Sequence, residues 1–140
     1  MTQPTSFRLP AELLARLEEE ARSSGSSVTT LVSTLLDEGL KIRRFPGIIY
    51  RAGPAGRRPG LVGGPDVWEL VRAMQHASGQ GEERLRKVAE ELDIPISRVR
   101  LAVDFYVVFP DEIDERIAAD THAASELRER ISRRDRLMSG

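Results

Sequence analysis

The chain has 140 residues, of which 40% are hydrophobic and 31% charged, and it contains no cysteine. This composition is typical of one or two small soluble domains and excludes disulfides and thiolate metal sites, as expected in a reducing cytoplasm. The formal net charge is -1, so any affinity for phosphate must come from local arginines and helix ends. The sequence lacks a signal peptide and an apolar run near 18 residues, so we expect neither export nor a membrane partner.

The segment TSFRLP predicts a short strand that Pro10 ends. Its apolar residues alternate with the others, which gives an extended chain one face to bury and one to expose. The apolar set is Thr5, Phe7 and Leu9, and the other set is Pro4, Ser6 and Arg8. A lone strand leaves its backbone groups unpaired, so this one requires a partner strand. An ordinary edge strand is the simpler alternative.

Two amphipathic helices follow, separated by SSGSS. The first is predicted over residues 10–24, with proline at its first position and Gly25 placed to close it in a left-handed conformation. Ser27 is the expected N-cap of the second, whose apolar stripe extends as far as Ile42 before Pro46. A unit of about 40 residues can hardly bury enough surface to fold alone, so we expect it to dimerise.

This stretch resembles the ribbon-helix-helix family of the Arc, MetJ and CopG repressors, in which strands from two chains pair and enter the DNA major groove. The resemblance implies that Pro4, Ser6 and Arg8 read bases. Arg8 is the sharpest candidate, since its planar fork can take guanine O6 and N7 together for about 1–3 kcal/mol of discrimination. The family usually has a donor-bearing side chain in place of Pro4, so Gln3 and Thr2 are alternative readers. The expected dimer core is Phe7, Leu9, Leu13, Leu17, Val32, Leu35 and Leu36.

A DNA phosphate is expected at the start of the second helix. Free N–H groups of Val28 and Thr29, with the hydroxyls of Ser27 and Thr29, can hold it and fix the register without reading sequence. The alternative is that SSGSS is an ordinary loop between helices.

Glycine and proline dominate PGIIYRAGPAGRRPGLVGGPD. Residues 48–50 and 61–62 predict the two strands of a hairpin, with AGPAGRRPG as its turn. Three arginines, Arg51, Arg57 and Arg58, have no acidic neighbour until Asp66, and they form either a basic wing on the DNA backbone or a solvated tip. A nucleotide-binding loop is disfavoured, since its Gly-Lys-Ser/Thr ending is missing.

Asp66 is expected to cap a helix that carries Trp68 in the core and ends at HASGQGEE. LRKVAEELDIPISRVRLAVDFYVVF then has the spacing of two helices packed across a turn at residues 93–95, a helix-turn-helix pattern. If this pattern bound DNA, Ser97, Arg98 and Arg100 would start the recognition helix. The run of apolar residues over 101–109 favours burial in a core or subunit interface instead.

Residues 45–118 resemble an antitoxin-associated helix-turn-helix domain of unknown function, family 433. The resemblance rests on the Phe-Pro-Gly-Ile start, GRRPGLVGGPDVWELV, VAEELDIPISRVRLAVDFY and FPDEID. It implies short strands followed by a helical bundle, often beside DNA-binding or toxin-neutralising segments. Residues 119–140 are expected to form a charged helix or tail with a thin apolar stripe, which leans on another subunit or frays.

No catalytic constellation is apparent. His76 and His122 lie in polar surroundings without cysteine or HExxH spacing, so we expect no metal, no cofactor and no enzymatic activity. The predicted fold is mainly α with short β, with a ribbon-helix-helix domain over 1–44 and a hairpin plus helix-turn-helix-like domain over 45–118. The expected function is a sequence-specific transcriptional regulator that binds double-stranded DNA as a homodimer, or as a tetramer assembled through the C-terminal domain. The alternatives are an antitoxin that also binds a toxin, and a purely structural oligomerisation module.

Overall fold

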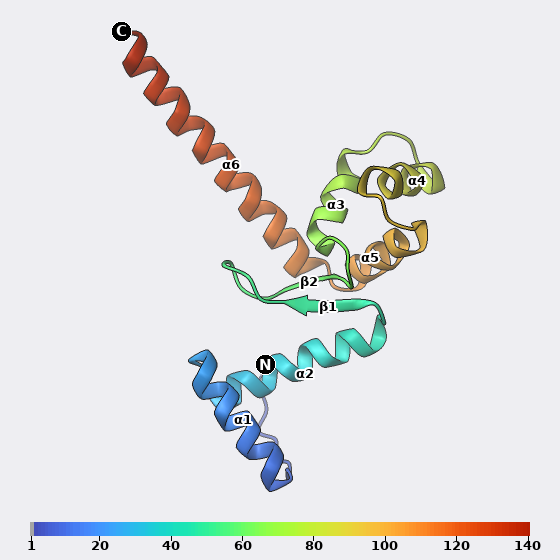
Figure 1. Cartoon of the computed structure of the whole chain (residues 1–140), viewed down its shortest axis with the longest axis vertical. Helices are drawn as coiled ribbons and strands as arrows, with labels where there is room; N and C mark the ends of the chain where they lie inside the picture. The colour runs from blue at the N-terminus through green and yellow to red at the C-terminus, as the bar shows by residue number, and fades with distance from the viewer. Residues whose placement is uncertain (1) are drawn as a thin grey trace. The chain divides into compact units, whose positions relative to one another are not determined.

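A computed structural model describes residues 2–140 (Figure 1). Over these residues the chain is mainly helical with one small two-stranded antiparallel sheet, as predicted. The helices are α1 (Ala11–Ser24), α2 (Val28–Arg44), α3 (Val67–His76), α4 (Gly81–Leu92), α5 (Ile96–Val108) and α6 (Pro110–Ser139), and the strands are β1 (Ile48–Arg51) and β2 (Arg58–Leu61). The chain divides into two compact units, unit 1 (Met1–Arg44) and unit 2 (Phe45–Gly140).

Unit 1 contains α1 and α2, which pack against each other. Gly25 ends α1 with a left-handed φ of 68°, and the N–H of Ser26 donates to the carbonyl of Ala21 at 2.9 Å, which closes the helix. The hydroxyl of Ser27 accepts the N–H of Thr30 at 3.1 Å and so caps α2. The glycine predicted to end the first helix and the serine predicted to start the second are both confirmed.

Residues 2–10 form neither helix nor strand in the single chain. Pro10 is the N-cap of α1, with an extended ψ of 142°, and not its first helical residue as predicted. An N-cap keeps non-helical dihedrals while its carbonyl accepts the first helical bond, here from the N–H of Leu14 at 3.0 Å. The strand expected over residues 5–9 needs a second chain to complete it, and it stays a prediction.

The hairpin of unit 2 pairs Ile48 with Leu61 and Arg51 with Arg58. The first predicted strand is confirmed, whereas the second was predicted over 61–62 and in fact covers Arg58–Leu61. Proline and glycine within this segment favoured a turn. A two-stranded sheet nevertheless tolerates a proline, because each strand has one side without a hydrogen-bonding neighbour. The turn is therefore shorter than predicted, and Arg58 belongs to the strand.

The core of unit 2 lies among the hairpin, α3, α4, α5 and the beginning of α6 (Figure 1). Its buried side chains are Ile48, Leu61, Val67, Leu70, Val71, Val88, Ala89, Val99, Ala102, Phe105 and Ile113. The rings of Phe45, Phe105 and Phe109 lie 5.3 to 6.1 Å apart at one end of α5. Trp68 packs against the core, as predicted, and Arg116 lies over its ring.

Helices α4 and α5 meet across residues 93–95, which confirms the predicted helix-turn-helix pattern. The turn needs a left-handed residue, and Asp93 supplies it with φ 52°. Val99, Ala102 and Phe105 of α5 are fully buried. The prediction that most of this helix is buried is therefore confirmed only in part. The helix packs against β2, α3, α4 and α6, whereas Val107 and Val108 at its end are 71% and 37% exposed.

α6 is one helix of 30 residues. It begins at Pro110, whose fixed φ suits a first turn, and Asp111 and Glu112 follow where negative charge favours the helix dipole. Residues 119–139 continue this helix without a break. Over the described part of the chain, no helix combines the length and the apolar content needed to cross a bilayer.

Candidate nucleic-acid interface

The predicted base-reading residues lie in the exposed segment before α1. Pro4, Ser6 and Arg8 are all exposed. The alternating residues Phe7 and Leu9 are also exposed, at 78% and 43%. Both faces of the segment therefore lie in solvent in the single chain, and the apolar face is a surface that association would cover.

Unit 1 leaves most of its apolar side chains outside. Over residues 2–44, Ala21 is the one hydrophobic side chain that is fully buried. Leu36 and Leu40 are 56% and 69% exposed, although both come from the middle of α2. Of the predicted dimer-core residues, Phe7, Leu9, Leu13, Leu35 and Leu36 are exposed, and Leu17 and Val32 are half-buried. The two helices thus have an apolar surface but hardly any core.

A groove of about 410 Å³ on α1 and α2 gathers part of this surface. Its apolar lining is Leu13, Leu17 and Leu35, and its polar lining is Arg16, Glu19 and Glu20. Apolar residues surrounded by charged ones are typical of surfaces that receive another protein element. Three predicted dimer-core residues from two helices therefore meet at one place.

The N-terminus of α2 has the backbone donors that a phosphate site requires, because the first N–H groups of a helix lack an intrahelical acceptor. Ser27 and Thr29 are exposed and Val28 is half-buried. The Ser27 hydroxyl is already engaged, since it accepts the N–H of Thr30 and donates to the Thr30 hydroxyl at 2.9 Å. A phosphate would therefore meet the N–H groups of Val28 and Thr29 and the Thr29 hydroxyl, with Ser27 holding the turn.

Asp66 pairs with two of the three hairpin arginines. Arg58 forms a short ion pair with one of its oxygens, and Arg51 lies 3.2 Å from the other. The Asp66 carboxylate is nearly buried. Arg51 can cross the hairpin because Gly60 has no side chain, and a Cβ there would collide with the guanidinium. These two arginines hold the hairpin against the start of α3.

The two predicted wing residues, Arg57 and Arg58, therefore differ in the partners that they contact. Arg58 is committed to Asp66 and also donates to the carbonyl of Ala52 at 3.2 Å. Arg57 lies in the turn and donates to the carbonyl of Tyr50 at 3.4 Å. A DNA backbone contact by Arg58 would have to compete with a nearly buried carboxylate.

The arginines of the helix-turn-helix are also engaged within unit 2. Arg100 donates to both oxygens of Glu82, at 2.7 and 2.8 Å, which ties the start of α4 to α5. This hydrogen bond lowers the pKa of the Glu82 carboxyl and raises that of Arg100. Arg98 donates to the carbonyl of Val62. The exposed side chains of α5 are Ser97, Arg100, Asp104, Val107 and Val108, a surface without excess positive charge.

Sequence reasoning identified these arginines but missed their partners. Asp66 was predicted only as a helix cap, a role that it does fill, since it forms a capping box with Glu69. The spacing of this Asp and Glu was the local signal available for that role. Glu82 had no such signal, because it lies 18 residues from Arg100 and only the tertiary fold brings the two together.

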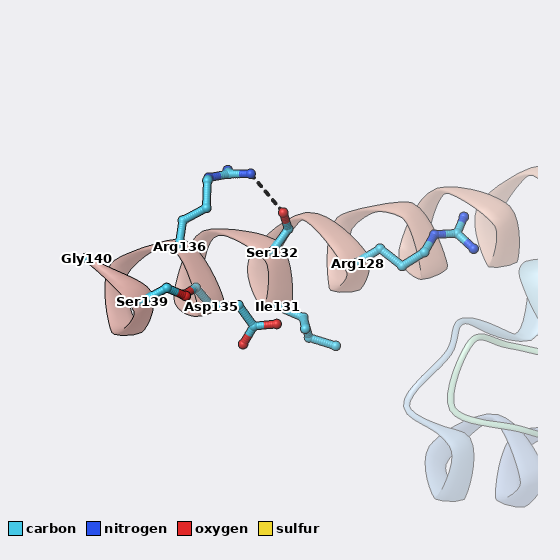
Figure 2. Close-up of a pocket in the computed structure, with 7 residues that line it drawn as sticks. All are labelled: Arg128, Ile131, Ser132, Asp135, Arg136, Ser139 and Gly140. Carbon is cyan, nitrogen blue, oxygen red and sulfur yellow. Dashed lines mark hydrogen bonds between the residues drawn. The ribbon is translucent and has the colours of Figure 1, made fainter.

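Three hollows lie on the described part of unit 2. One, of about 480 Å³, lies among the hairpin turn, Trp68 and α6, and its charged lining mixes arginines with carboxylates. A second, of about 370 Å³, lies between α3 and the end of α4. The third, of about 630 Å³, is an open surface lined by seven residues of α6 alone (Figure 2). Over the described residues, no three histidine or carboxylate side chains gather as metal ligands would.

Comparison of the chain with protein-family models, curated proteins and solved structures finds no match. The function therefore has to be inferred from the side chains described above. Two features of unit 1 bear on it: the uncovered apolar surface, and the exposed donors of Arg8 and of the α2 N-terminus.

Proposed function

We propose that the chain is a sequence-specific DNA-binding transcriptional regulator that acts as a dimer, with unit 1 as a ribbon-helix-helix domain. Residues 5–9 of two copies pair as an antiparallel ribbon, and Ser6 and Arg8 enter the major groove. The N-terminus of α2 holds a phosphate beside the groove. The observation that carries this proposal is the exposed apolar surface of unit 1, which includes five of the seven residues of the predicted dimer core, Phe7, Leu9, Leu13, Leu35 and Leu36.

The energetics of unit 1 favour a second copy as the cover for that surface. Ordering one residue of backbone costs about 1–2 kcal/mol, and burial of apolar area recovers about 25 cal/mol per Å². In the single chain Ala21 is the only hydrophobic side chain of the described part of unit 1 that is fully buried. Covering Phe7, Leu35 and Leu36 in a dimer supplies the missing burial, and pairing the segment around Phe7 satisfies its backbone groups.

The proposed contact with DNA follows from the polar residues that alternate with the apolar face of this segment. When Phe7 and Leu9 point into a dimer, Ser6 and Arg8 point outward on the same ribbon. Arginine suits direct recognition of guanine, and the serine hydroxyl can accept or donate hydrogen bonds to several bases. In unit 2, by contrast, Arg58 and Arg100 are paired with carboxylates. Unit 2 is therefore assigned to assembly and unit 1 to recognition.

The proposal is tested by selecting bound duplexes from a random pool and measuring the affinity of variants for the selected sequence. Arg8→Ala should weaken that affinity by about 5- to 150-fold for each guanine that Arg8 recognises, corresponding to about 1–3 kcal/mol. The variant should remain a dimer, because Arg8 lies outside the apolar face. Arg86→Ala, which removes an exposed arginine of α4, is the matched control and should bind like the unaltered protein.

Two results would contradict the proposal. The first is a selection that enriches no common sequence. The second is an Arg8→Ala variant that binds the selected duplex as tightly as the Arg86→Ala control. Either would favour the alternative that unit 1 only dimerises.

A further inference from the structure

The second half of α6 leaves the core of unit 2. Ile113 is buried and Ile117 packs against the core, and the pair between Arg72 and Asp120 joins α6 to α3. Beyond Asp120, the described hydrogen bonds and ion pairs lie within α6 itself. Figure 1 shows this part of the helix projecting away from α3, α4 and α5. A helical segment of this length without tertiary contacts is only marginally stable in water.

Most of the large apolar residues of this half lie on one seam of the helix, and Leu137, which is 82% exposed, lies beside that seam. Counting from Ile117, the steps alternate between three and four residues, which is the spacing that keeps side chains facing a second helix. The positions along the seam are Ile117, Asp120, Ala124, Leu127, Ile131, Arg134 and Met138. Leu127, Ile131 and Met138 are 57%, 47% and 80% exposed. The seam therefore starts in the core of unit 2 and continues as an uncovered apolar stripe.

From this pattern we infer that residues 124–138 of α6 pair in parallel and in register with the same residues of a second copy. Figure 2 shows Ile131 and Asp135 on one side of the helix and Arg136 on the other. In a parallel pair the side chain of Arg130 lies next to Asp135 of the second copy, five residues on, and opposite charges meet across the seam. An antiparallel pair that matched Leu127 with Ile131 would instead bring the two Arg130 side chains together.

Arg134 limits the strength of this pair. It occupies a seam position, where two copies would place two guanidinium groups side by side, although Asp135 lies 3.7 Å from it in the same chain. A polar residue in a seam costs stability and at the same time fixes the register. The pair therefore rests on the dimer proposed for unit 1, which holds two α6 helices in one molecule and raises their effective concentration.

The natural absence of cysteine makes disulfide trapping a clean test on the full chain. Leu127→Cys and Met138→Cys each place a thiol on the seam, and Glu129→Cys places one on the opposite, exposed face. In a thiol–disulfide buffer, Leu127→Cys and Met138→Cys should both form covalent dimers at least several-fold more completely than Glu129→Cys. Only a parallel, in-register pair brings identical residues together at two positions eleven residues apart.

Sedimentation of the cysteine variants in reducing buffer separates this inference from the proposed function. A dimer in which neither seam cysteine cross-links better than Glu129→Cys overturns the α6 pair and leaves unit 1 as the dimer interface. Cross-linking at only one of the two seam positions overturns the parallel arrangement. Leu36→Asp is expected to remove the unit 1 interface. If both seam cysteines still cross-link in that background, the α6 pair is supported, but its dependence on unit 1 is contradicted. If a different protein occupied the seam, neither seam cysteine would cross-link.

Discussion

At the scale of single residues, Asp66 joins three parts of unit 2. Its carboxylate accepts Arg51 and Arg58 from the hairpin, and its capping box with Glu69 starts α3. The side chain of Asp66 is 9% exposed, and those of the two arginines are about one third exposed. Ion pairs that are this much buried contribute little net free energy to folding. Removing one partner nevertheless lowers stability strongly, because the remaining charges stay partly buried.

Asp66→Asn should therefore lower the free energy of unfolding of unit 2 by about 2–4 kcal/mol, through removal of the charge and weakening of the cap. The measurement is urea unfolding followed by the fluorescence of Trp68, the single tryptophan of the chain. Glu90→Gln changes an exposed carboxylate of α4 and should stay within about 0.5 kcal/mol of the unaltered protein. Equal stabilities of the two variants would show that Asp66 has no such role.

Arg100 shows how an exposed arginine can be engaged within its own unit. Its Nη1 and Nη2 both donate to Glu82, and Asp104 is also exposed on α5. Arg100→Ala should change the affinity for the selected duplex by less than about twofold, measured by fluorescence anisotropy at fixed salt. A tenfold loss would instead assign a DNA contact to the helix-turn-helix.

At the scale of elements, the bend between α5 and α6 is held by a tyrosine. The hydroxyl of Tyr106 donates to a carboxylate oxygen of Asp114 at 2.7 Å. This hydrogen bond raises the pKa of Tyr106 above its ordinary value of 10.0, because a phenolate would lie next to the negative charge of Asp114. The bond adds to the packing of α5 against α6 and to the ring cluster at the end of α5.

The sign of this shift predicts a loss of stability in alkali. A folded-state pKa above the unfolded value means that the contribution of Tyr106 is complete below about pH 10 and disappears as the pH rises through the folded-state pKa. Tyr106→Phe should remove this part of the alkaline decline. The check is to measure the free energy of unfolding of the unaltered protein and of Tyr106→Phe at alkaline pH. The result is compared with the ultraviolet titration of the phenolates in both proteins. Parallel declines would mean that the bond is not formed.

The seam of α6 predicts a stabilising change. Arg134→Leu replaces the charged seam position with an apolar one, so cross-linking of Leu127→Cys should become more complete in the double variant. Arg133→Leu, which changes the neighbouring residue away from the seam, should have no such effect. Equal cross-linking of Leu127→Cys in the Arg134→Leu and Arg133→Leu backgrounds would argue against the seam.

At the scale of the whole molecule, the two units differ in how they are stabilised. Unit 2 contains a core of its own, in which Leu61, Val67, Leu70, Val88, Val99, Ala102 and Phe105 are excluded from solvent. Unit 1 has no comparable core in the single chain. Its stability should then depend steeply on protein concentration, as for any fold that exists only in a dimer, whereas that of unit 2, whose core is complete in the single chain, should depend on it much less.

Thermal unfolding at two protein concentrations tests this difference. Trp68 reports on unit 2, and circular dichroism adds the helices of unit 1. The transition seen only by circular dichroism should move upward by several degrees as the concentration rises, and the Trp68 transition should move much less. Leu36→Asp should remove the first transition alone. One shared transition that is independent of concentration would contradict a dimeric unit 1.

Local signals explain why much of the fold was predictable from the sequence. Gly25, Ser27 and Asp66 act within three or four residues of themselves, so the ends of three helices could be placed from the chain alone. The turn at Asp93 was likewise predicted from the apolar spacing on either side. The second hairpin strand was misplaced, because strand pairing depends on a partner and not on the composition of the strand itself.

In the candidate site, too, some features could be predicted from the sequence and others could not. By itself the sequence determined which residues alternate in the segment around Arg8 and which faces of α1 and α2 are apolar, because both follow from the periodicity of strand and helix. Only the tertiary structure decided that Arg58 and Arg100 are held by Asp66 and Glu82. It also decided that the apolar side chains of unit 1 remain uncovered in a single chain. Charge pairing and burial depend on distances between residues far apart in the sequence, and the folded chain alone sets those distances.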